Sequence, residues 1–274
     1  MVNKKIEIAV ISDVHLGTFG SHAEEVLTYL NGINPEMLII NGDLVDIWQF
    51  RKRYFPKSHL AVLQKVFQIA ANGTTVYFIP GNHDDLIRKF GDFSIGNLHF
   101  RNELELEINN QKIWVHHGDK YDKAVRNQRI AAFGGYVYEH FILLEKGVNW
   151  ILNKFRIRPI RVAKTLKSFS KKMSKKSVDF EAKAIEEAMQ KQCDIMICGH
   201  THQPKKQIIE NENGKVLYLN SGDWVENLSA LEYNNEQWQV IRFAETSPVT
   251  TEKITLSTDI ITPKEPRELA FDLK

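Results

Sequence analysis

Cysteine is scarce in this sequence, and long apolar runs are absent. Cys193 and Cys198 are the two cysteines among 274 residues, and they flank one predicted strand. This pattern does not suggest a disulfide framework, and we expect Cys198 to pack in the core. No stretch reaches the roughly 18 consecutive apolar residues of a membrane-spanning helix. Because no internal repeat is visible either, we expect neither a disulfide-stabilised domain, nor a transmembrane protein, nor a repeat array.

The composition is that of an ordinary globular protein. Hydrophobic residues make up 43% of the chain and charged residues 26%, which excludes a disordered chain. The length suffices for one large domain with insertions. The start, "MVNKKIEIAVISD", has lysines before an apolar run, as a signal peptide has, but the run is short. Cleavage there would remove Asp13 and His15, so we expect a cytoplasmic protein.

The stretch "DIMICGHTHQPKK" places two histidines directly after a predicted strand. Residues 195–198 are apolar, which is typical of a buried parallel strand, and Gly199 allows a turn. Side chains two apart in an extended segment point the same way, so His200 and His202 are predicted to converge on one point. Ligands bind at this edge of open α/β sheets. Alternatively, this is a polar loop with incidental histidines, and the rest of the sequence decides between the two.

Four other apolar runs end in the same way. Their polar, glycine-flanked ends are Asp13-Val14-His15, Gly42-Asp43, Gly81-Asn82-His83-Asp84 and His116-His117-Gly118-Asp119. Carboxylate, amide and imidazole groups without a thiolate suit Mn, Fe or Zn. Five such blocks in succession are very unlikely to arise by chance. We therefore predict a metal centre built from strand ends.

The blocks D-x-H, G-D, G-N-H-D, H-G-D and G-H-x-H, in this order, resemble the calcineurin-like metallophosphoesterase superfamily over about residues 6–240. The resemblance implies an α/β (α+β) fold, a four-layer sandwich of two mixed β-sheets flanked by helices. It also implies two divalent metals about 3.5–4 Å apart at the strand ends. We expect Mn²⁺, with Fe or Zn as alternatives.

The resemblance also implies a role for each matching residue. The expected ligands of one metal are Asp13, His15 and His202. The expected ligands of the other metal are Asn82, His117 and His200. Asp43 would bridge both metals, His83 would be the general acid, Asp84 would orient His83, and Asn82 and His83 would stabilise charge on the phosphoryl oxygens.

The remaining histidines are predicted not to bind metal. In the H-G-D block the family ligand is the histidine directly before glycine, which is His117. Strand alternation turns His116 toward the opposite face, which favours a packed core histidine. The histidines without ligand spacing are His22, His59, His99 and His140.

Periodicity and turn residues predict a βα-rich domain over residues 1–245, with a C-terminal extension over 246–274 to which no role is assigned. Strands are expected near 6–11, 37–40, 75–79, 98–100, 103–108, 112–116, 194–198, 206–210, 215–219, 229–233 and 237–242. Helices are expected near 21–33 with Ser21 as N-cap, 58–71 and 178–191.

Residues 121–176 form a predicted helical insertion of unusual charge. They contain 14 Lys and Arg against 3 Asp and Glu, a net charge of +11, whereas the remaining residues have a net charge of −9. Apolar residues at three- and four-residue steps, among them Phe133, Val137 and Phe141, indicate one apolar helix face. Pro159 should divide the insertion into a helical hairpin. It is either a helix pair packed on the core, or a lid with an apolar groove for acyl chains and a basic rim for phosphate or anionic membrane.

Within the superfamily, "SDVHLG", "GDLVDIW" and a basic insertion after H-G-D resemble the UDP-2,3-diacylglucosamine diphosphatase group of lipid A biosynthesis. That resemblance implies a lipid-linked nucleotide substrate, with UMP and a lipid sugar 1-phosphate as products, and contact of the lid with the inner face of the membrane. Proteobacterial members commonly have Arg where this chain has His83, and "GNHD" and "SGDWVE" are closer to a sister branch. The candidate substrate contacts are Arg51, Arg53, Arg88 and Phe141.

Two other readings use the same sequence. A nuclease or other phosphodiesterase would place the basic insertion on a nucleic-acid backbone. The cations here are interleaved with aliphatic residues more than with stacking aromatics, so nucleic acid is not the expected partner. A scaffold without activity is disfavoured, because all seven ligand positions are filled.

Overall fold

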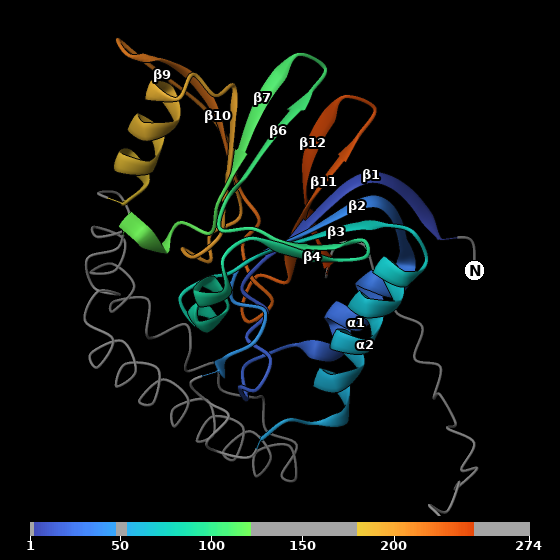
Figure 1. Ribbon diagram of the computed structural model, residues 1–274. Helices are drawn as coiled ribbons and strands as arrows, with labels where there is room; N and C mark the ends of the chain where they lie inside the picture. Colours follow the sequence, from blue (N-terminus) through green and yellow to red (C-terminus); the bar gives the residue numbers. More distant parts are fainter. Residues whose placement is uncertain (1–2, 48–53, 122–179, 244–274) are drawn as a thin grey trace, which may run out of the picture.

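Two mixed β-sheets form the centre of the protein in the computed structural model, which describes residues 3–47, 54–121 and 180–243 (Figure 1). The first sheet contains, in spatial order, β12 (Gln237–Arg242), β11 (Ser229–Asn234), β1 (Lys4–Ile11), β2 (Ile33–Asn41), β3 (Thr75–Ile79), β5 (Leu98–Phe100) and β4 (Phe93–Ile95). The second contains β6 (Leu104–Ile108), β7 (Gln111–Val115), β8 (Ile195–Cys198), β10 (Gly214–Asn220) and β9 (Lys205–Asn211).

The central strands of both sheets are parallel. In the first sheet β1 pairs with β2 and β2 with β3, and in the second β7 pairs with β8 and β8 with β10. The outer pairs β1–β11, β4–β5, β6–β7 and β9–β10 are antiparallel. Because parallel strands end at the same edge, the polar residues that follow β1, β2, β3, β7 and β8 are carried to one side of the molecule.

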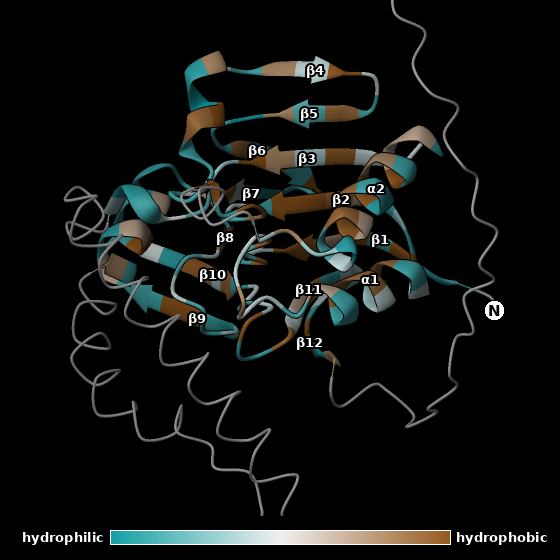
Figure 2. Cartoon of the chain, turned by 90° about the horizontal axis from the view of Figure 1, so that it is seen from below, coloured by the Kyte–Doolittle hydropathy of each residue, from teal (hydrophilic) through white to brown (hydrophobic). Residues whose placement is uncertain are grey.

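Alternation along the strands divides the apolar side chains among three layers of core. Val10 and Ile39 pack between the two sheets. Their neighbours Ile11 and Ile40 face the helices on the outer side of the first sheet, and Met196 faces the helix over residues 180–190 on the outer side of the second. Figure 2 shows hydrophobic residues gathered along β2 and β3. The predicted four-layer sandwich is therefore confirmed.

Helices α1 (Ala23–Gly32) and α2 (Lys57–Ala71) cover the outer face of the first sheet (Figure 1). His22, not the predicted Ser21, is the N-cap residue of α1. Helix α2 ends at Asn72 and Gly73, as the sequence predicted, and Gly73 has a φ of +102° that glycine adopts without strain.

The remaining predicted strands and the predicted helices are found with shifts of a few residues at their ends. Among the described residues, elements that were not predicted include the three-residue strand β4 and the short 3-10 helices η2 (Asp85–Phe90) and η3 (Asp119–Tyr121). Elements this short show too few turns of a period to be recognised in sequence.

Several sequence predictions concern residues outside the described ranges. These are the insertion beyond Tyr121, the extension over 246–274, and the candidate substrate contacts Arg51, Arg53 and Phe141. Within the described residues, no helix combines the length and apolar composition needed to cross a membrane.

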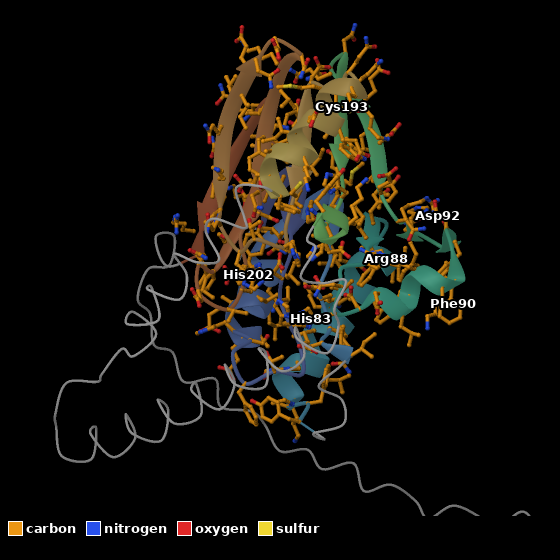
Figure 3. The ribbon with its side chains drawn as sticks, turned by 90° about the vertical axis from the view of Figure 1, so that its left-hand side faces the viewer. His83, Arg88, Phe90, Asp92, Cys193 and His202 are labelled. Carbon is orange, nitrogen blue, oxygen red and sulfur yellow. The ribbon has the colours of Figure 1, made fainter. Side chains whose placement is uncertain are left out.

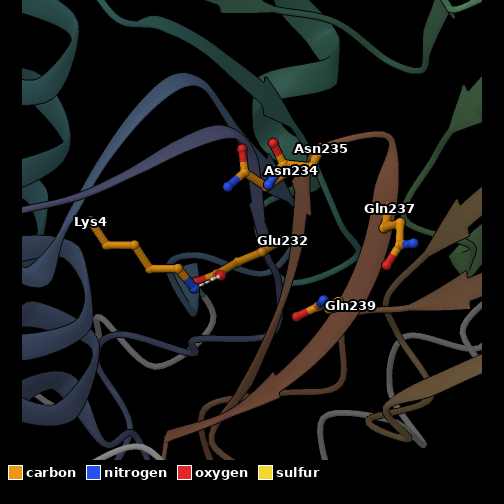
Figure 4. A pocket seen from close by; sticks show the side chains of 6 residues that line it. All are labelled: Lys4, Glu232, Asn234, Asn235, Gln237 and Gln239. Atoms are coloured by element: carbon orange, nitrogen blue, oxygen red, sulfur yellow. Dashed lines mark hydrogen bonds and ion pairs between the residues drawn. The ribbon is translucent and has the colours of Figure 1, made fainter.

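A polar pocket lies at the edge of the first sheet where β1 begins, opposite the edge with the predicted ligands (Figure 4). It is lined by an ion pair between Lys4 and Glu232 and by four amide side chains. The Tyr29 hydroxyl also donates to Glu232, at 3.2 Å. The buried carboxylate is thus already satisfied within the protein.

Candidate metal centre

The blocks that follow the central strands meet at one edge, as the sequence predicted. Potential ligand atoms lie within 4.8 Å of one another in each of three groups, and one of them, His15, Asp43 and His83, shares His15 and Asp43 with the other two. The first group, called here the first half-site, is Asp13, His15 and His202. The second group, called the second half-site, is Asp43, His117 and His200. Figure 3 shows His202 and His83 in the lower half of the view, away from Cys193 near the top.

In the first half-site, two side chains from the loop after β1 in the first sheet converge with one from the loop after β8 in the second. Nε2 of His202 lies 3.1 Å from Oδ1 of Asp13 and 3.3 Å from Nε2 of His15. Nε2 of His15 is also 3.9 Å from Oδ2 of Asp43. Two imidazoles this close repel if both are protonated, and a shared cation removes that conflict.

In the second half-site, the environment of His117 leaves one ring nitrogen for a ligand. Its Nδ1–H donates to the Asn41 carbonyl, at 2.8 Å. Its Nε2 lies 3.3 Å from Oδ2 of Asp43 without hydrogen-bonding geometry. A backbone carbonyl that fixes one nitrogen and leaves the other facing the site is the usual environment of a metal-binding histidine.

The carboxylates and the amide are arranged in the same way. Oδ2 of Asp13 accepts the backbone N–H of His200 at 3.1 Å, and Oδ1 of Asp43 accepts that of His83 at 2.8 Å. The other oxygen of each carboxylate faces the site. Oδ1 of Asn82 is buried and has no hydrogen-bond partner in the structure, which is unfavourable unless a ligand compensates. This donor set of nitrogen and oxygen atoms fits two divalent cations.

Glycines beside the ligands allow the blocks to approach each other. A Cβ on Gly42, which has a φ of +87°, would lie 2.1 Å from Nδ1 of His117. A Cβ on Gly81 would lie 2.1 Å from Oδ1 of Asp43. Any larger residue at either position would displace a predicted ligand.

Five predicted ligands have left-handed backbone conformations with φ between 52° and 64°. They are Asp13, His15, Asp43, His200 and His202. Such conformations in residues other than glycine each cost about 1–3 kcal/mol and are found at functional sites.

This backbone corrects one prediction. The segment that carries His200 and His202 is not extended, and the two imidazoles belong to different half-sites. The prediction that they converge on one point because they are two apart in a strand is therefore wrong. The division between two metals that the family resemblance implied agrees with the geometry.

Burial and neighbouring charges shift the pKa values of the cluster. Burial would raise the pKa of Asp13, but His202 and His117 outweigh it and lower that pKa to about 2. Burial would lower the pKa of His117, but Asp43 and Asp13 raise it to about 10. The pKa of His202 is raised in the same way, mainly by Asp13, to about 9. Without metal, protons on these histidines balance the carboxylates.

His83 is oriented by a residue that the sequence did not single out. Its Nδ1 lies 3.0 Å from Oδ2 of Asp46, in "GDLVDIW". Burial would lower the pKa of His83, but Asp43 and the hydrogen bond to Asp46 raise it to about 8. In the metal-free protein the imidazole is therefore mostly protonated at neutral pH, as a proton donor must be.

Asp84 has a different function from the predicted one. Its oxygens accept the backbone N–H groups of Gly81 at 2.6 Å and Leu44 at 2.9 Å. Asp84 therefore joins the G-N-H-D loop to the G-D loop. The prediction that Asp84 orients the His83 ring is wrong, since Asp46 makes that contact.

Arg88 also serves the protein rather than the predicted substrate contact. Its guanidinium donates to both oxygens of Asp119, at 2.6 and 2.8 Å, and to the carbonyl of Pro80 at 2.5 Å. This bidentate pair connects η2, which follows the G-N-H-D loop, to the H-G-D loop. Figure 3 shows Arg88 between His83 and Phe90.

His116 points away from the metal centre, as predicted. It is 3% exposed and its ring packs against Trp114, with a centroid distance of 4.2 Å. Its Nε2 lies 3.5 Å from the sulfur of Cys198, which is fully buried. The predictions that His116 and Cys198 pack in the core are confirmed.

A sixth strand-end block, after β10, was not predicted to take part. The Ser221 hydroxyl lies 2.7 Å from that of Ser12, and the Asp223 carboxylate accepts backbone N–H groups of the following turn. Asn227 in this turn donates to the carbonyl of His202 at 2.7 Å. The signal was present, because "YLNSGDW" is another apolar run that ends in a glycine-flanked aspartate.

The arrangement suits hydrolysis at phosphorus. When bound, two divalent cations supply Lewis-acid charge and a hydroxide nucleophile near neutral pH. The protein's own residues add a buried amide at Asn82 and the imidazole of His83, beside Asp43, which would hold both cations. These groups can stabilise the developing charge on phosphoryl oxygens and donate a proton to the leaving oxygen.

Comparisons with known proteins found relatives by sequence and by structure. A UDP-2,3-diacylglucosamine hydrolase from Wigglesworthia glossinidia brevipalpis is 28% identical over 252 residues, covering 85% of this chain and 93% of that protein. One from Histophilus somni (strain 2336) is 27% identical, covering 84% and 97%. Among solved structures, Yfce, a phosphoesterase from E. coli, is 15% identical with a TM-score of 0.44, covering 89% and 96%.

The family model described as calcineurin-like phosphoesterase matches residues 6–204, well over half of the chain. This range contains each of the seven predicted ligands and His83. The chain therefore belongs to the calcineurin-like phosphoesterase family and is a metal-dependent hydrolase of phosphoester or pyrophosphate bonds.

Proposed function

We propose that this protein hydrolyses the pyrophosphate of UDP-2,3-diacylglucosamine, or of a similar lipid-linked nucleotide, to give UMP and a lipid sugar 1-phosphate. The relatives named UDP-2,3-diacylglucosamine hydrolase, at 23–28% identity over most of the chain, support this substrate class. The metals would be two Mn²⁺ ions, since carboxylate, amide and imidazole ligands suit Mn²⁺, with Fe or Zn as competitors in purified protein.

The observation that carries this proposal is the position of the two ends of the basic insertion. The rings of Tyr121 and Phe180, the described residues on either side of the gap, lie 5.9 Å apart. The Phe180 ring is also 5.7 Å from the ring of His200 in the second half-site. The described residues on both sides of 122–179 therefore lie near each other, and Phe180 lies beside the metal centre.

The sequence of that insertion combines two properties that a lipid-phosphate substrate requires. Residues 121–176 have a net charge of +11 together with an apolar helical stripe. Each buried methylene of an acyl chain contributes about 0.8 kcal/mol, and each Lys or Arg near an anionic surface about 1 kcal/mol. A nucleic-acid site needs the cations without the stripe, and a packing element needs the stripe without the cations. Peripheral contact with an anionic membrane is part of the proposal.

The test is a comparison of substrates with Mn²⁺ present: UDP-2,3-diacylglucosamine, bis-p-nitrophenyl phosphate and single-stranded DNA. The acylated substrate should be preferred. Phe141→Asp should abolish its hydrolysis and leave turnover of bis-p-nitrophenyl phosphate largely unchanged, because the predicted ligands are untouched. Equal loss on both substrates would assign the apolar stripe to folding.

The charge is tested separately with vesicles. Replacing Lys171, Lys172, Lys175 and Lys176 with Gln should weaken binding to anionic vesicles, most clearly at low salt, where screening is least. Neutral vesicles are the control. Tight DNA binding without any dependence on anionic lipid would favour a nuclease instead.

A further inference from the structure

His59 has no ligand spacing in the sequence, yet its side chain is almost completely enclosed. It lies in the first turn of α2 and is 2% exposed. Its ring packs edge-on against those of Tyr54 and Phe55, with centroid distances of 5.7 and 5.5 Å. Its Nδ1 accepts the backbone N–H of Gly17 at 2.8 Å. A buried polar side chain with a directed hydrogen bond to a loop suggests a function beyond packing.

The bonded glycine belongs to the turn that carries His15. The carbonyl of His15 accepts the backbone N–H of Thr18 at 3.2 Å and its hydroxyl at 2.9 Å, which closes a turn over residues 15–18. Gly17 has a φ of +100° within this turn, and His15 itself a φ of 52°. The backbone of this turn is therefore strained at a predicted ligand, His15, and the hydrogen bond from Gly17 to His59 stabilises it.

The same turn is hydrogen-bonded to the loop after β2, which carries Asp43. Leu16 accepts the backbone N–H of Asp46 at 2.8 Å and donates its own to Leu44 at 2.9 Å. A displacement of the 15–18 turn would move His15 directly. The backbone of Asp46 is hydrogen-bonded to Leu16, but its side chain is bonded to His83. The bond to His83 limits how far Asp46 can move.

The direction of the bond defines what can replace His59. Because Nδ1 accepts a hydrogen, it carries no proton, and the neutral ring has its proton on Nε2. An Asn side chain can place Oδ1 where Nδ1 lies. Gln places its amide farther along the side chain, near the position of Nε2, and Leu offers no acceptor.

We infer that His59 is a positioning residue that fixes the turn carrying His15, and thereby sets the metal affinity of the first half-site without contacting the metal. The inference rests on the ligand assignment of the metal centre and not on the lipid substrate. Losing a group that orients a ligand typically weakens metal binding about 10- to 100-fold. The second half-site, whose ligands are held by other contacts, should keep its affinity.

The first measurement needs no metal. Amide hydrogen exchange in ¹⁵N-labelled, metal-free protein reports the Gly17 N–H. Its protection should persist in His59→Asn and fall about tenfold or more in His59→Gln and His59→Leu, because the amide then lacks its acceptor. Unchanged protection in His59→Gln would overturn the assigned bond.

The second measurement is a Mn²⁺ titration followed by calorimetry and by the paramagnetic resonance signal of coupled ion pairs. The parent should bind two ions per chain. His59→Gln should bind one ion as the parent does and the other about tenfold or more weakly. His202→Asn supplies the titration curve expected when the first half-site is lost. His200→Asn supplies the curve expected when the second is lost.

Rescue and destabilisation controls decide between positioning and packing. His59→Asn should restore two-ion binding. Val62→Ala, at a fully buried position on the same helix, should lower the Tm without changing the ratio of the two affinities. Equal weakening of both half-sites in His59→Gln, or failure of Asn to rescue, would overturn the inference. A parent that binds fewer than two ions would instead overturn the ligand assignment. If His59→Leu does not fold, the affinities of the two half-sites can still be compared in His59→Gln.

Discussion

The two half-sites use the same kinds of side chain but are held by different parts of the protein. In the first, hydrogen bonds from outside the cluster hold the ligand loops, through His59 to Gly17 and through Asn227 to His202. In the second, the Asn41 carbonyl fixes His117, and the ring of Phe180 packs beside His200. Each half-site has two buried ligands and one half-buried histidine, which is His202 in the first and His200 in the second.

This difference shows that a symmetric set of ligands does not imply two equivalent metal sites. The second half-site lies beside Phe180, so changes at Phe180 should affect it first. The following variants test this division.

The largest effect should come from the residue shared by both half-sites. Asp43→Asn removes the bridging charge, and we expect binding of both ions to weaken and the rate to fall roughly 10⁴-fold or more. Metal analysis after loading with Mn²⁺ and a steady-state assay check this. Retention of two tightly bound ions would show that Asp43 does not bridge.

His83→Ala should separate catalysis from metal binding. The metals should remain, while the rate falls about 10²–10⁴-fold, the usual range for loss of a general acid. Elemental analysis and kcat with saturating Mn²⁺ are the measurements. If His83→Ala empties a half-site, then His83 is a ligand and its assigned role is wrong.

Asp46→Asn should have a smaller effect on rate, about 10- to 100-fold, as expected for weakening a hydrogen bond to a charged group. It should also change the pH profile. The protonated form of His83 is active, so activity declines as pH rises through its pKa, which Asp46 helps to raise. Removing the Asp46 charge lowers that pKa and moves the decline to lower pH. An unchanged alkaline limb in Asp46→Asn would contradict this coupling.

Metal affinity should itself depend on pH, in both half-sites. Without metal, the pKa values of His202 and His117 are raised to about 9 and about 10, so both are protonated at pH 7. Binding must displace these protons. Affinity should therefore rise as pH increases toward 9, by about tenfold per pH unit for each proton released. Calorimetry in buffers of different ionisation enthalpy counts the protons, and a value near zero at pH 7 would contradict the assignment.

The smallest effect should be that of Phe180→Leu. It keeps an apolar side chain but removes the ring beside His200, so we expect a few-fold weaker second half-site and an unchanged first one. The same titration that tests His59 measures it. Gly118→Ala should act in the same direction, since its Cβ would lie 2.6 Å from the Phe180 ring and its φ is +113°. Weaker metal binding at the first half-site alone in Phe180→Leu would contradict the assignment of Phe180 to the second half-site.

Much of the centre could be predicted from sequence, because the information is local. Each predicted ligand except His15 and His202 lies within three residues of a strand end, and parallel strands carry their ends to one edge. The order of the five blocks, the buried position of His116 and the boundaries of α2 follow from spacing, alternation and a C-terminal Asn-Gly. The sequence by itself thus determined the fold class, the edge of the sheets and the residue types of the site.

The partners of these residues were decided by the tertiary structure. The His83 ring contacts Asp46 and not Asp84, the residue next to it in sequence. Arg88 binds Asp119 instead of facing the substrate. His200 and His202 fall into separate half-sites because left-handed backbone, not strand alternation, directs them. Nothing in the spacing of His59 relates it to Gly17, 42 residues earlier. Such contacts join segments far apart in sequence, and their geometry depends on backbone conformations that the surrounding fold stabilises against their local cost.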